Sequence, residues 1–213
     1  MAGDPYVYPG TDVLRNKLGI RNAAQLTVVE TDLHDLRAAQ LAERSIPGRY
    51  DLGHLQRFHR HLFGDVYEWA GQIRTVAIAK SDMFALPQFI ESYAKESLRP
   101  LADEQHLEGL DRDEFASKVA GYFADVNAAH PFREGNGRSQ RAFFGQLARD
   151  AGYEIAWEHV DPERNIEASI AAIRGDERPL RKLLAEATTE LTRVLERDSA
   201  SRDEFDDDLG IDL

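Results

Sequence analysis

Apolar residues recur at helical spacing along most of the chain. Between residues 22 and 44 the apolar side chains are three or four positions apart: Leu26, Val29, Leu33 and Leu36. This spacing places them on one face of an amphipathic helix. A second run of the same kind covers residues 51–69, after a break at 45–48 that contains proline and glycine.

The second half of the chain repeats this alternation of helical runs and breaks. Further helices are expected at residues 87–100, 111–129, 138–150, 161–175 and 179–197. The order Asp111, Arg112, Asp113, Glu114 resembles a capping box at a helix start. Pro87 suits a first helical position, and Gly152 is typical of a residue that follows a helix end.

One segment interrupts the helical pattern. Residues 72–86 contain a β-branched run, Ile73 to Ile78, followed by polar turn residues. They predict a small hairpin or an extended flap. The predicted fold class is therefore all-α, a helical bundle with one small β-hairpin flap. We expect an N-terminal extension at 1–21, one domain at 22–197 and a disordered acidic tail at 198–213.

Composition narrows the function classes. The chain has 213 residues, no cysteine and a formal net charge of −12. These features exclude disulfides and thiolate metal sites, and they disfavour nucleic acid as a direct partner. No apolar run approaches the length of a membrane helix, and the first ten residues do not resemble a signal peptide. We therefore expect a cytoplasmic protein without a membrane partner.

The most informative stretch is residues 130–141, which read His-Pro-Phe-Arg-Glu-Gly-Asn-Gly-Arg-Ser-Gln-Arg. Gly135 and Gly137 lie just before an expected helix start, where free amide donors and the helix dipole attract phosphate. Arg138 and Arg141 are three positions apart, so both project from one side of the first turn. Together these residues predict a polyphosphate cradle.

Three further side chains in this stretch suit the chemistry of a phosphate ester. Glu134 lies beside the predicted cradle, and a carboxylate there requires a cation such as Mg²⁺ between it and the phosphates. His130 is suited to accept a proton near neutral pH. Asn136 can donate through its amide to a phosphate oxygen.

Each of these residues also has a purely structural interpretation. His130 could cap a helix, the glycines could form an ordinary turn, and Arg138 with Arg141 could form a solvated face. Taken singly, each structural interpretation is the more common one. Their combination within twelve residues favours a functional site. His59 and His61, outside this stretch, are interpreted as surface or helix-packing residues.

The stretch resembles the signature of the Fic (filamentation induced by cAMP) family, His-x-Phe-x-[Asp/Glu]-Gly-Asn-Gly-Arg-x-x-Arg. The specified positions are filled by His130, Phe132, Glu134, Gly135, Asn136, Gly137, Arg138 and Arg141. Residues 62–71 resemble the family segment that leads into its flap. The span from about residue 4 to 195 is similar to small bacterial Fic toxins that work with a separate antitoxin.

The resemblance implies a protein adenylyltransferase. A Tyr, Thr or Ser hydroxyl of a target protein would attack the α-phosphate of ATP while His130 accepts its proton. Glu134 would hold Mg²⁺. The phosphates would be bound by Gly135, Asn136, Gly137, Arg138 and Arg141.

The resemblance also implies a mode of target binding. The flap residues would pair with an extended segment of the target by strand addition, with Phe84 as an anchor. These residues are Ile78, Ala79, Lys80, Ser81, Asp82, Met83 and Phe84. The alternative is that the flap only covers the core.

Regulation follows from the same resemblance. Many family members are silenced by a helix carrying [Ser/Thr]-x-x-x-Glu-[Gly/Asn], whose glutamate pairs with the second motif arginine. The two partial matches, at residues 92–97 and 192–197, do not complete this pattern. A separate small antitoxin is therefore expected, with its glutamate at Arg141.

The target and the donor are less constrained. Toxins of this type suggest DNA gyrase and topoisomerase IV subunits as targets. Gly137 stands where the family's kinase branch has lysine, which favours AMP transfer over phosphorylation. Two alternatives remain: a Fic-type transferase that uses UTP, GTP or a phosphocholine conjugate, and a non-catalytic nucleotide-binding module.

Overall fold

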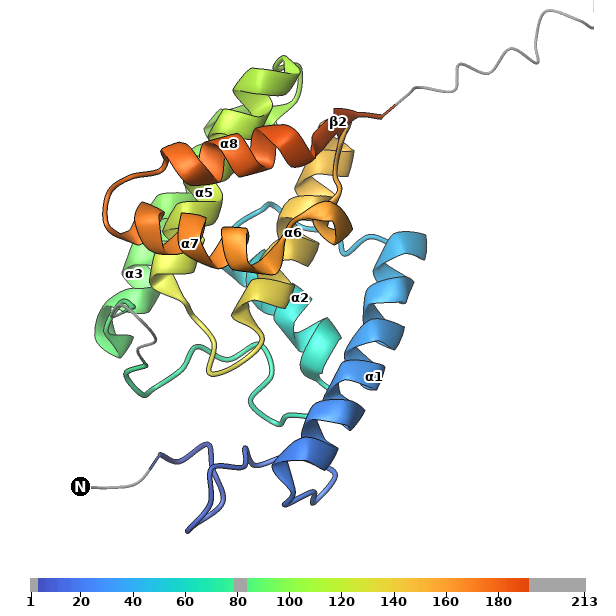
Figure 1. Cartoon of the computed structure of the whole chain (residues 1–213), viewed down its shortest axis with the longest axis vertical. Helices are drawn as coiled ribbons and strands as arrows, with labels where there is room; N and C mark the ends of the chain where they lie inside the picture. Colours follow the sequence, from blue (N-terminus) through green and yellow to red (C-terminus); the bar gives the residue numbers. More distant parts are fainter. Residues whose placement is uncertain (1–3, 79–83, 192–213) are drawn as a thin grey trace, which may run out of the picture.

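The computed structural model describes residues 4–78 and 84–191. These residues form a mainly helical body (Figure 1), as the apolar pattern predicts. The elements are α1 (Ala23–Glu43), α2 (Leu52–Phe63), α3 (Pro87–Leu98), α4 (Pro100–Asp103), η1 (Gln105–Leu107), α5 (Arg112–Ala129), α6 (Asn136–Asp150), β1 (Tyr153–Ile155), η2 (Trp157–His159), α7 (Pro162–Ile173), α8 (Arg178–Ala187) and β2 (Thr188–Glu190).

Helix α5 is the centre of the body. It packs against α3, α6, α7 and α8, while α1 and α2 pack against each other and α2 reaches α6 (Figure 1). Phe115, Val119 and Val126 of α5 are completely buried, as are Phe143 and Phe144 of α6. Burial of these large apolar side chains holds the end of α5 and the start of α6 in one place.

Short polar side chains begin four of the helices. Each accepts a hydrogen bond from the backbone N–H three residues later, which satisfies an otherwise unpaired donor. These caps are Asn22, Asp51, Asp111 and Asp161. The predicted capping residue Asp111 is confirmed, as are helix starts at Pro87 and Pro162.

The predicted helix at residues 51–69 is too long. Helix α2 ends at Phe63, and the chain then turns through Gly64. Val66 and Trp69 are still buried, at 1% and 8% exposure, because the turns fold back onto the core. The spacing of these apolar residues therefore indicated that they are buried, not that they are helical.

The last predicted helix is also too long. Helix α8 ends at Ala187, and β2 pairs antiparallel with β1, Ile155 opposite Thr188. The β-branched pair Thr188 and Thr189 favours this strand. Residues 192–197 of the predicted helix and the whole predicted tail at 198–213 lie outside the described residues.

Two smaller predictions change at α1 and the flap. Leu36 is 56% exposed rather than on the buried face, which α1 forms instead with Leu26, Glu30 and Leu41. The described legs of the flap, residues 72–78 and 84–86, contain no strand. They fit the extended flap better than the hairpin, and residues 79–83 lie outside the described part.

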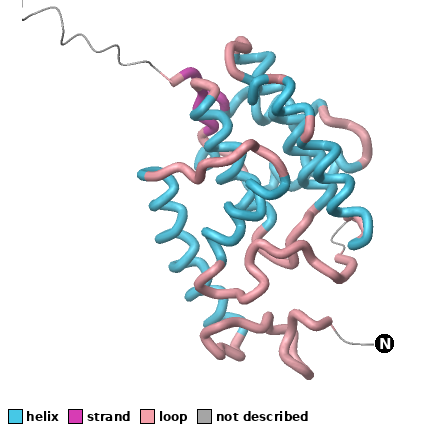
Figure 2. Tube along the Cα trace, turned by 180° about the vertical axis from the view of Figure 1, so that it is seen from behind, coloured by secondary structure: helices cyan, strands magenta, loops and turns pink. Residues whose placement is uncertain are grey.

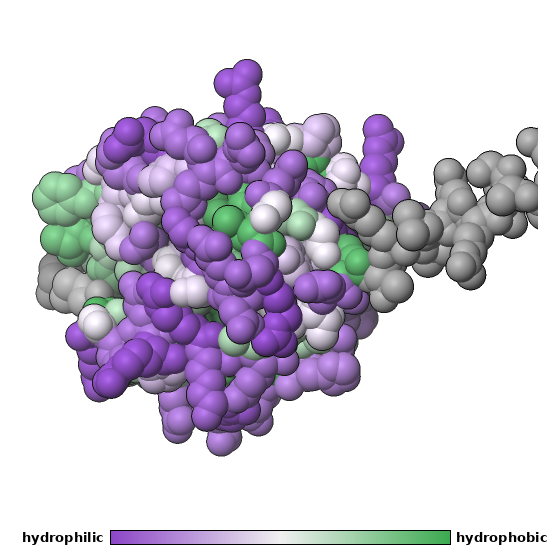
Figure 3. Space-filling view, turned by 90° about the horizontal axis from the view of Figure 1, so that it is seen from above, coloured by the Kyte–Doolittle hydropathy of each residue, from purple (hydrophilic) through white to green (hydrophobic). Residues whose placement is uncertain are grey.

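Loops gather at one end of the body. The segments that follow α2 and α5 lie there together with the N-terminal residues, as two opposite views agree (Figures 1 and 2). The face seen in Figure 3 is mostly hydrophilic, with small apolar patches. No helix within the described residues is long and apolar enough to span a membrane.

Candidate active site

His130 lies at the junction between α5 and the loop to α6. It is the C-cap of α5 and has a left-handed backbone, with φ 43°. Non-glycine residues rarely adopt this conformation, so the surrounding contacts must hold it. Its N–H donates to the Val126 carbonyl at 3.0 Å, and its side chain is mostly buried.

The glycine turn before α6 is required by shape. Gly135 has φ 77° and is the N-cap of α6. A Cβ atom at this position would lie 2.4 Å from the Phe63 ring, so only glycine fits. Phe63 thus sets how closely the turn approaches α2.

The first turn of α6 offers unpaired donors. Within the described residues, the backbone N–H groups of Asn136, Gly137 and Arg138 have no hydrogen-bond acceptor, and no side chain caps the helix. Their dipoles add to the positive helix end. This arrangement favours an anion in front of Gly137, which is exposed.

His130 and this helix start share one cavity of about 430 Å³. It is lined by Asp4, Ala77, Ile78, Phe84, His130, Arg133, Glu134, Asn136 and Gly137. The structure therefore brings the predicted base, the predicted metal ligand and the glycine turn together. The turn and the imidazole come from adjacent ends of two helices that are fixed by the core.

Asn136 has a contact that the sequence did not reveal. Its side-chain oxygen accepts from the Phe132 N–H at 2.8 Å, and its amide donates to the Phe132 carbonyl at 2.7 Å. It is 4% exposed. The side chain therefore braces the loop, and the backbone N–H of Asn136 is the group left to bind an anion.

Arg138 is held by side chains from α1, α2 and the loop before α6. Its Nη2 atom lies 2.5 Å from Oε1 of Glu30 in α1 and 3.7 Å from Oε1 of Glu134. Its guanidinium lies over the Phe63 ring, 4.6 Å from the centroid. Glu30 also accepts a hydrogen bond from Tyr67 and is itself nearly buried. Sequence reasoning missed Glu30, although an acid on the apolar face of α1 was the available signal.

Arg141 lies three residues after Arg138 on the same side of α6, since both line one hollow. Burial, followed by the charge of Arg138, lowers the pKa of its guanidinium. No ion pair or hydrogen bond within the described residues neutralises it. A Cβ at Gly137 would lie 3.6 Å from its Nη1 atom, so the guanidinium stays close to the turn.

Both motif arginines line a second hollow, a groove of about 240 Å³ between α1, α6 and the segment after α6. Apolar residues from α1 and α6, together with Trp157, form its walls. The predicted phosphate ligands are thus divided between two neighbouring hollows, on either side of the α6 start.

His59 supports the loop from below. It is completely buried, and its Nδ1 accepts from the Gly71 N–H at 2.8 Å. Its Nε2 therefore carries the proton and donates to the Glu134 carbonyl at 2.9 Å. Burial lowers the pKa of His59 to about 4. It is not a surface residue, and it does more than pack, because it fixes the backbone of Glu134.

Phe84 covers the His130 imidazole. The two rings are stacked, with centroids 3.8 Å apart and 12° between their planes, and Phe84 is 8% exposed. Ile78 and Phe84 both line the cavity. The other predicted flap residues, at positions 79–83, lie outside the described residues.

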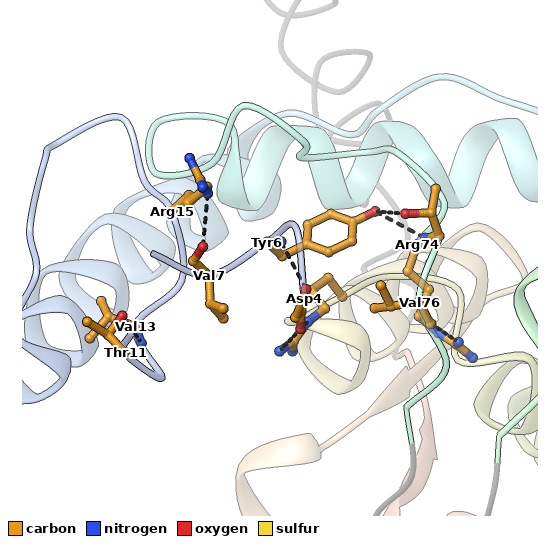
Figure 4. Close-up of polar contacts among 10 residues, drawn as sticks. Asp4, Tyr6, Val7, Thr11, Val13, Arg15, Arg74 and Val76 are labelled. Atoms are coloured by element: carbon orange, nitrogen blue, oxygen red, sulfur yellow. Dashed lines mark hydrogen bonds and ion pairs between the residues drawn. The ribbon is translucent and has the colours of Figure 1, made fainter. Parts of the chain in front are cut away.

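The N-terminal segment forms part of the cavity wall. Asp4 pairs with Arg133, with Oδ2 2.9 Å from Nη2. The Tyr6 hydroxyl accepts from the Thr75 N–H at 3.1 Å, and Figure 4 shows Tyr6 beside Arg74 and Val76. The expected extension at 1–21 therefore reaches the site through the residues that the structure describes.

Comparison with known proteins agrees with this geometry. A sequence profile of the Fic/DOC family matches residues 49–148. A relative from Sinorhizobium fredii, named probable protein adenylyltransferase y4lH, is 42% identical, over 83% of this chain and 92% of the relative. The chain belongs to the Fic/DOC family. The profile span contains the glycine turn and His130 but not α1 or the N-terminal segment.

Two further members place the Fic/DOC chain among known proteins. Protein adenylyltransferase VbhT of Bartonella schoenbuchensis is 45% identical over 90% of this chain, which spans 40% of VbhT's length. The solved N-terminal Fic domain of an effector from Bartonella quintana, with bound ADP, superimposes with a TM-score of 0.82. It is 31% identical over 88% of this chain and 95% of that domain.

Proposed function

We propose that this Fic/DOC chain is a protein adenylyltransferase that transfers AMP from ATP to a Tyr, Thr or Ser hydroxyl of a target protein. The observation that supports this most is the cavity in which the His130 imidazole and the unpaired amides of the α6 start occur together. Relatives named adenylyltransferases and the ADP bound to the Bartonella quintana domain support the same activity and nucleotide class.

In this proposal His130 accepts the proton of the target hydroxyl. The hydroxyl oxygen forms a bond to the α-phosphorus, the bond from that phosphorus to the bridging oxygen breaks, and pyrophosphate leaves. The backbone N–H groups of Asn136 and Gly137 stabilise the charge that develops on phosphate oxygens. Their positions are set before ATP binds, so little reorganisation is needed.

Glu134 is the residue that would hold Mg²⁺. It is exposed to the cavity, and its Oε1 accepts from the Gly135 N–H at 2.9 Å, which aims the carboxylate at the helix start. A single carboxylate with substrate phosphates suits this ion, and the described residues contain no cluster of three or more acidic or histidine ligands. The ion, when bound, would neutralise charge on the phosphates.

Arg138 and Arg141 would bind the outer phosphates. Arg141 is the stronger candidate because it is partly buried and has no counter-charge within the described residues, so an anion would relieve an uncompensated cation. The same feature supports the proposed regulation, in which a small antitoxin places a glutamate at Arg141. The 240 Å³ groove beside it would receive the helix that carries this glutamate.

The target would approach over the flap. Phe84 lies against His130, so a target side chain must pass this ring to reach the imidazole. We propose further that an extended segment of the target pairs with residues 78–84 by strand addition. The proposal also includes a cytoplasmic location and a toxin role, with gyrase or topoisomerase IV as the target.

The test is transfer of label from ATP to protein. Purified wild-type chain, Mg²⁺, α-labelled ATP and gyrase or topoisomerase IV subunits are incubated, and the modified subunit is weighed by mass spectrometry. We expect the mass increment of AMP with wild type and with His159→Ala, an exposed histidine control, and none with His130→Ala. Equal labelling by His130→Ala would exclude the mechanism, and a different increment would identify another donor.

A further inference from the structure

Arg74 is the largest fully buried side chain of the structure, at 1% exposure. It lies at the start of the flap, outside the motif of residues 130–141, and it does not line the catalytic cavity. Burial lowers the pKa of its guanidinium. A buried arginine requires hydrogen-bond acceptors for all of its donors, so its partners indicate its role.

The partners of Arg74 are backbone carbonyls from three segments. Nη1 donates to Val76 on the first flap leg at 2.6 Å, and Nη2 donates to Ala85 on the second leg at 2.6 Å. Nε donates to the carbonyl of His130 itself at 2.8 Å. The guanidinium therefore joins the two legs of the flap to the catalytic residue, and Figure 4 shows Arg74 beside Val76.

Two more contacts complete this connection. The Arg74 N–H donates to the Pro131 carbonyl at 2.8 Å, and Nη2 also approaches the Ala129 carbonyl at 3.4 Å. A separate backbone bond runs from Ala85 N–H to Ala128 at 3.0 Å. The carbonyls on both sides of His130 are thus bound by the residue that sets the separation of the flap legs.

Only the shape of arginine serves all of these acceptors. Its planar fork has five N–H donors in fixed directions, whereas lysine has one flexible ammonium group. Within the described residues, every acceptor of the Arg74 guanidinium lies on the flap legs or beside His130, which a role in core packing alone would not require. These acceptors therefore indicate that Arg74 positions the flap legs relative to His130.

The flap and the loop at His130, which Arg74 connects, also contact each other at the cavity. His130 has the left-handed φ of 43°, which its neighbours must maintain, and Phe84, next to Ala85, stacks on its ring. A shift of the Arg74 guanidinium would move the imidazole and the Phe84 ring relative to each other. A displacement of about 1 Å between reacting groups can reduce the reaction rate about 100-fold.

We infer that Arg74 is a positioning residue that couples the flap to the catalytic base, so that target docking and proton transfer occur in one fixed geometry. This inference rests on the proposed function, in which His130 is the base and the flap receives the target. Arg74 itself touches neither ATP nor target. It acts through the backbone at His130, Val76 and Ala85.

Arg74→Lys and Arg74→Met in the full chain test this role. Arg57→Lys is the matched control, because Arg57 also donates to a backbone carbonyl, that of Pro47, which lies on neither the flap legs nor the loop at His130. We expect kcat for AMP transfer to fall about 100-fold in Arg74→Lys, with unchanged ATP affinity and a folded chain. Arg57→Lys should transfer AMP at the wild-type rate.

Two outcomes would overturn the inference. Arg74→Lys could transfer AMP at the wild-type rate, or it could lose ATP binding and thermal stability together with activity, which would indicate a general role in the fold. Arg74→Met should show the larger fall in kcat if it folds. If it does not fold, Arg74→Lys decides.

A second readout separates this inference from the proposed function. Hydrogen exchange of the Ala85 and His130 amides should be faster in Arg74→Lys than in wild type, whether or not AMP is transferred. Unchanged exchange at both amides would contradict the coupling. Absence of transfer by wild type, with faster exchange in the variant, would instead reject the proposed activity and keep the structural connection.

Discussion

At the scale of single residues, the turn before α6 depends on the absence of a side chain. Gly135→Ala would place a Cβ 2.4 Å from the Phe63 ring at a φ of 77°. We expect the free energy of unfolding to fall by about 1–3 kcal/mol and ATP binding to weaken, because the ring or the turn must move. Denaturant titration and ATP titration measure the two effects. Gly121→Ala, in the middle of α5 with no contact closer than 3.9 Å, should not lower stability.

The same residue scale shows what the sequence could and could not predict. Spacing and residue type predicted His130, Glu134 and Gly137 in one site, because all three are close in the chain, and all three line one cavity. Glu30 and His59 were missed, since each reaches the site only through a fold contact with a residue more than seventy positions away. The Asn136 side chain was assigned to phosphate but is engaged by the loop backbone.

His59 makes stability depend on pH in a defined direction. Burial lowers its folded pKa to about 4, below the value of about 6.5 in an unfolded chain. Between these two pKa values the unfolded state therefore binds more protons than the folded state. The contribution of neutral His59 to the free energy of unfolding is fully present above about pH 6.5 and is lost as the pH falls toward 4. His59→Gln, whose amide can still meet Gly71 and Glu134, should reduce this dependence.

Denaturant titrations across that pH range measure the effect. Carboxylates also titrate there, so the readout is the difference between wild type and His59→Gln. The exposed His159→Gln serves as the control and should match wild type. A variant profile parallel to that of wild type would contradict a buried, neutral His59.

At the scale of elements, α1 acts as a support of the site although the family profile does not include it. Its Glu30 binds Arg138 and Tyr67, and these three side chains are all largely removed from solvent. The helix itself was predicted from its apolar spacing. Its contact with the start of α6 could not be predicted, because the Glu30–Arg138 pair joins residues 108 positions apart.

Glu30→Ala tests this support. Removal of the carboxylate leaves Arg138 without its main partner, and we expect the free energy of unfolding to fall by about 3 kcal/mol. The exposed Glu43→Ala at the end of the same helix is the control and should change little. A double-mutant cycle with Arg138→Gln should show coupling between the two positions. Additive effects would mean that the pair does not hold α1 to α6.

At the scale of the whole molecule, the two ends of the described chain have different relations to the site. The N-terminal segment reaches the cavity through Asp4, and it reaches Thr75 of the first flap leg through Tyr6 (Figure 4). The C-terminal strand β2 pairs with β1, and neither strand lines the cavity that contains His130. Helical spacing could not predict that the N-terminal segment reaches the cavity, because residues 4–21 contain no helix.

Truncations at the two ends therefore distinguish an effect on the site from an effect on the fold. A chain that begins at Pro9 loses the Asp4–Arg133 pair and the Tyr6–Thr75 bond but keeps the buried Val13. We expect it to remain folded and to transfer AMP about tenfold more slowly, because the cavity wall and the first flap leg lose support. A chain that ends at Leu191 keeps β2 and should match wild type in both thermal melting and transfer rate. Full transfer by the chain that begins at Pro9 would show that the N-terminal segment covers the site without supporting it.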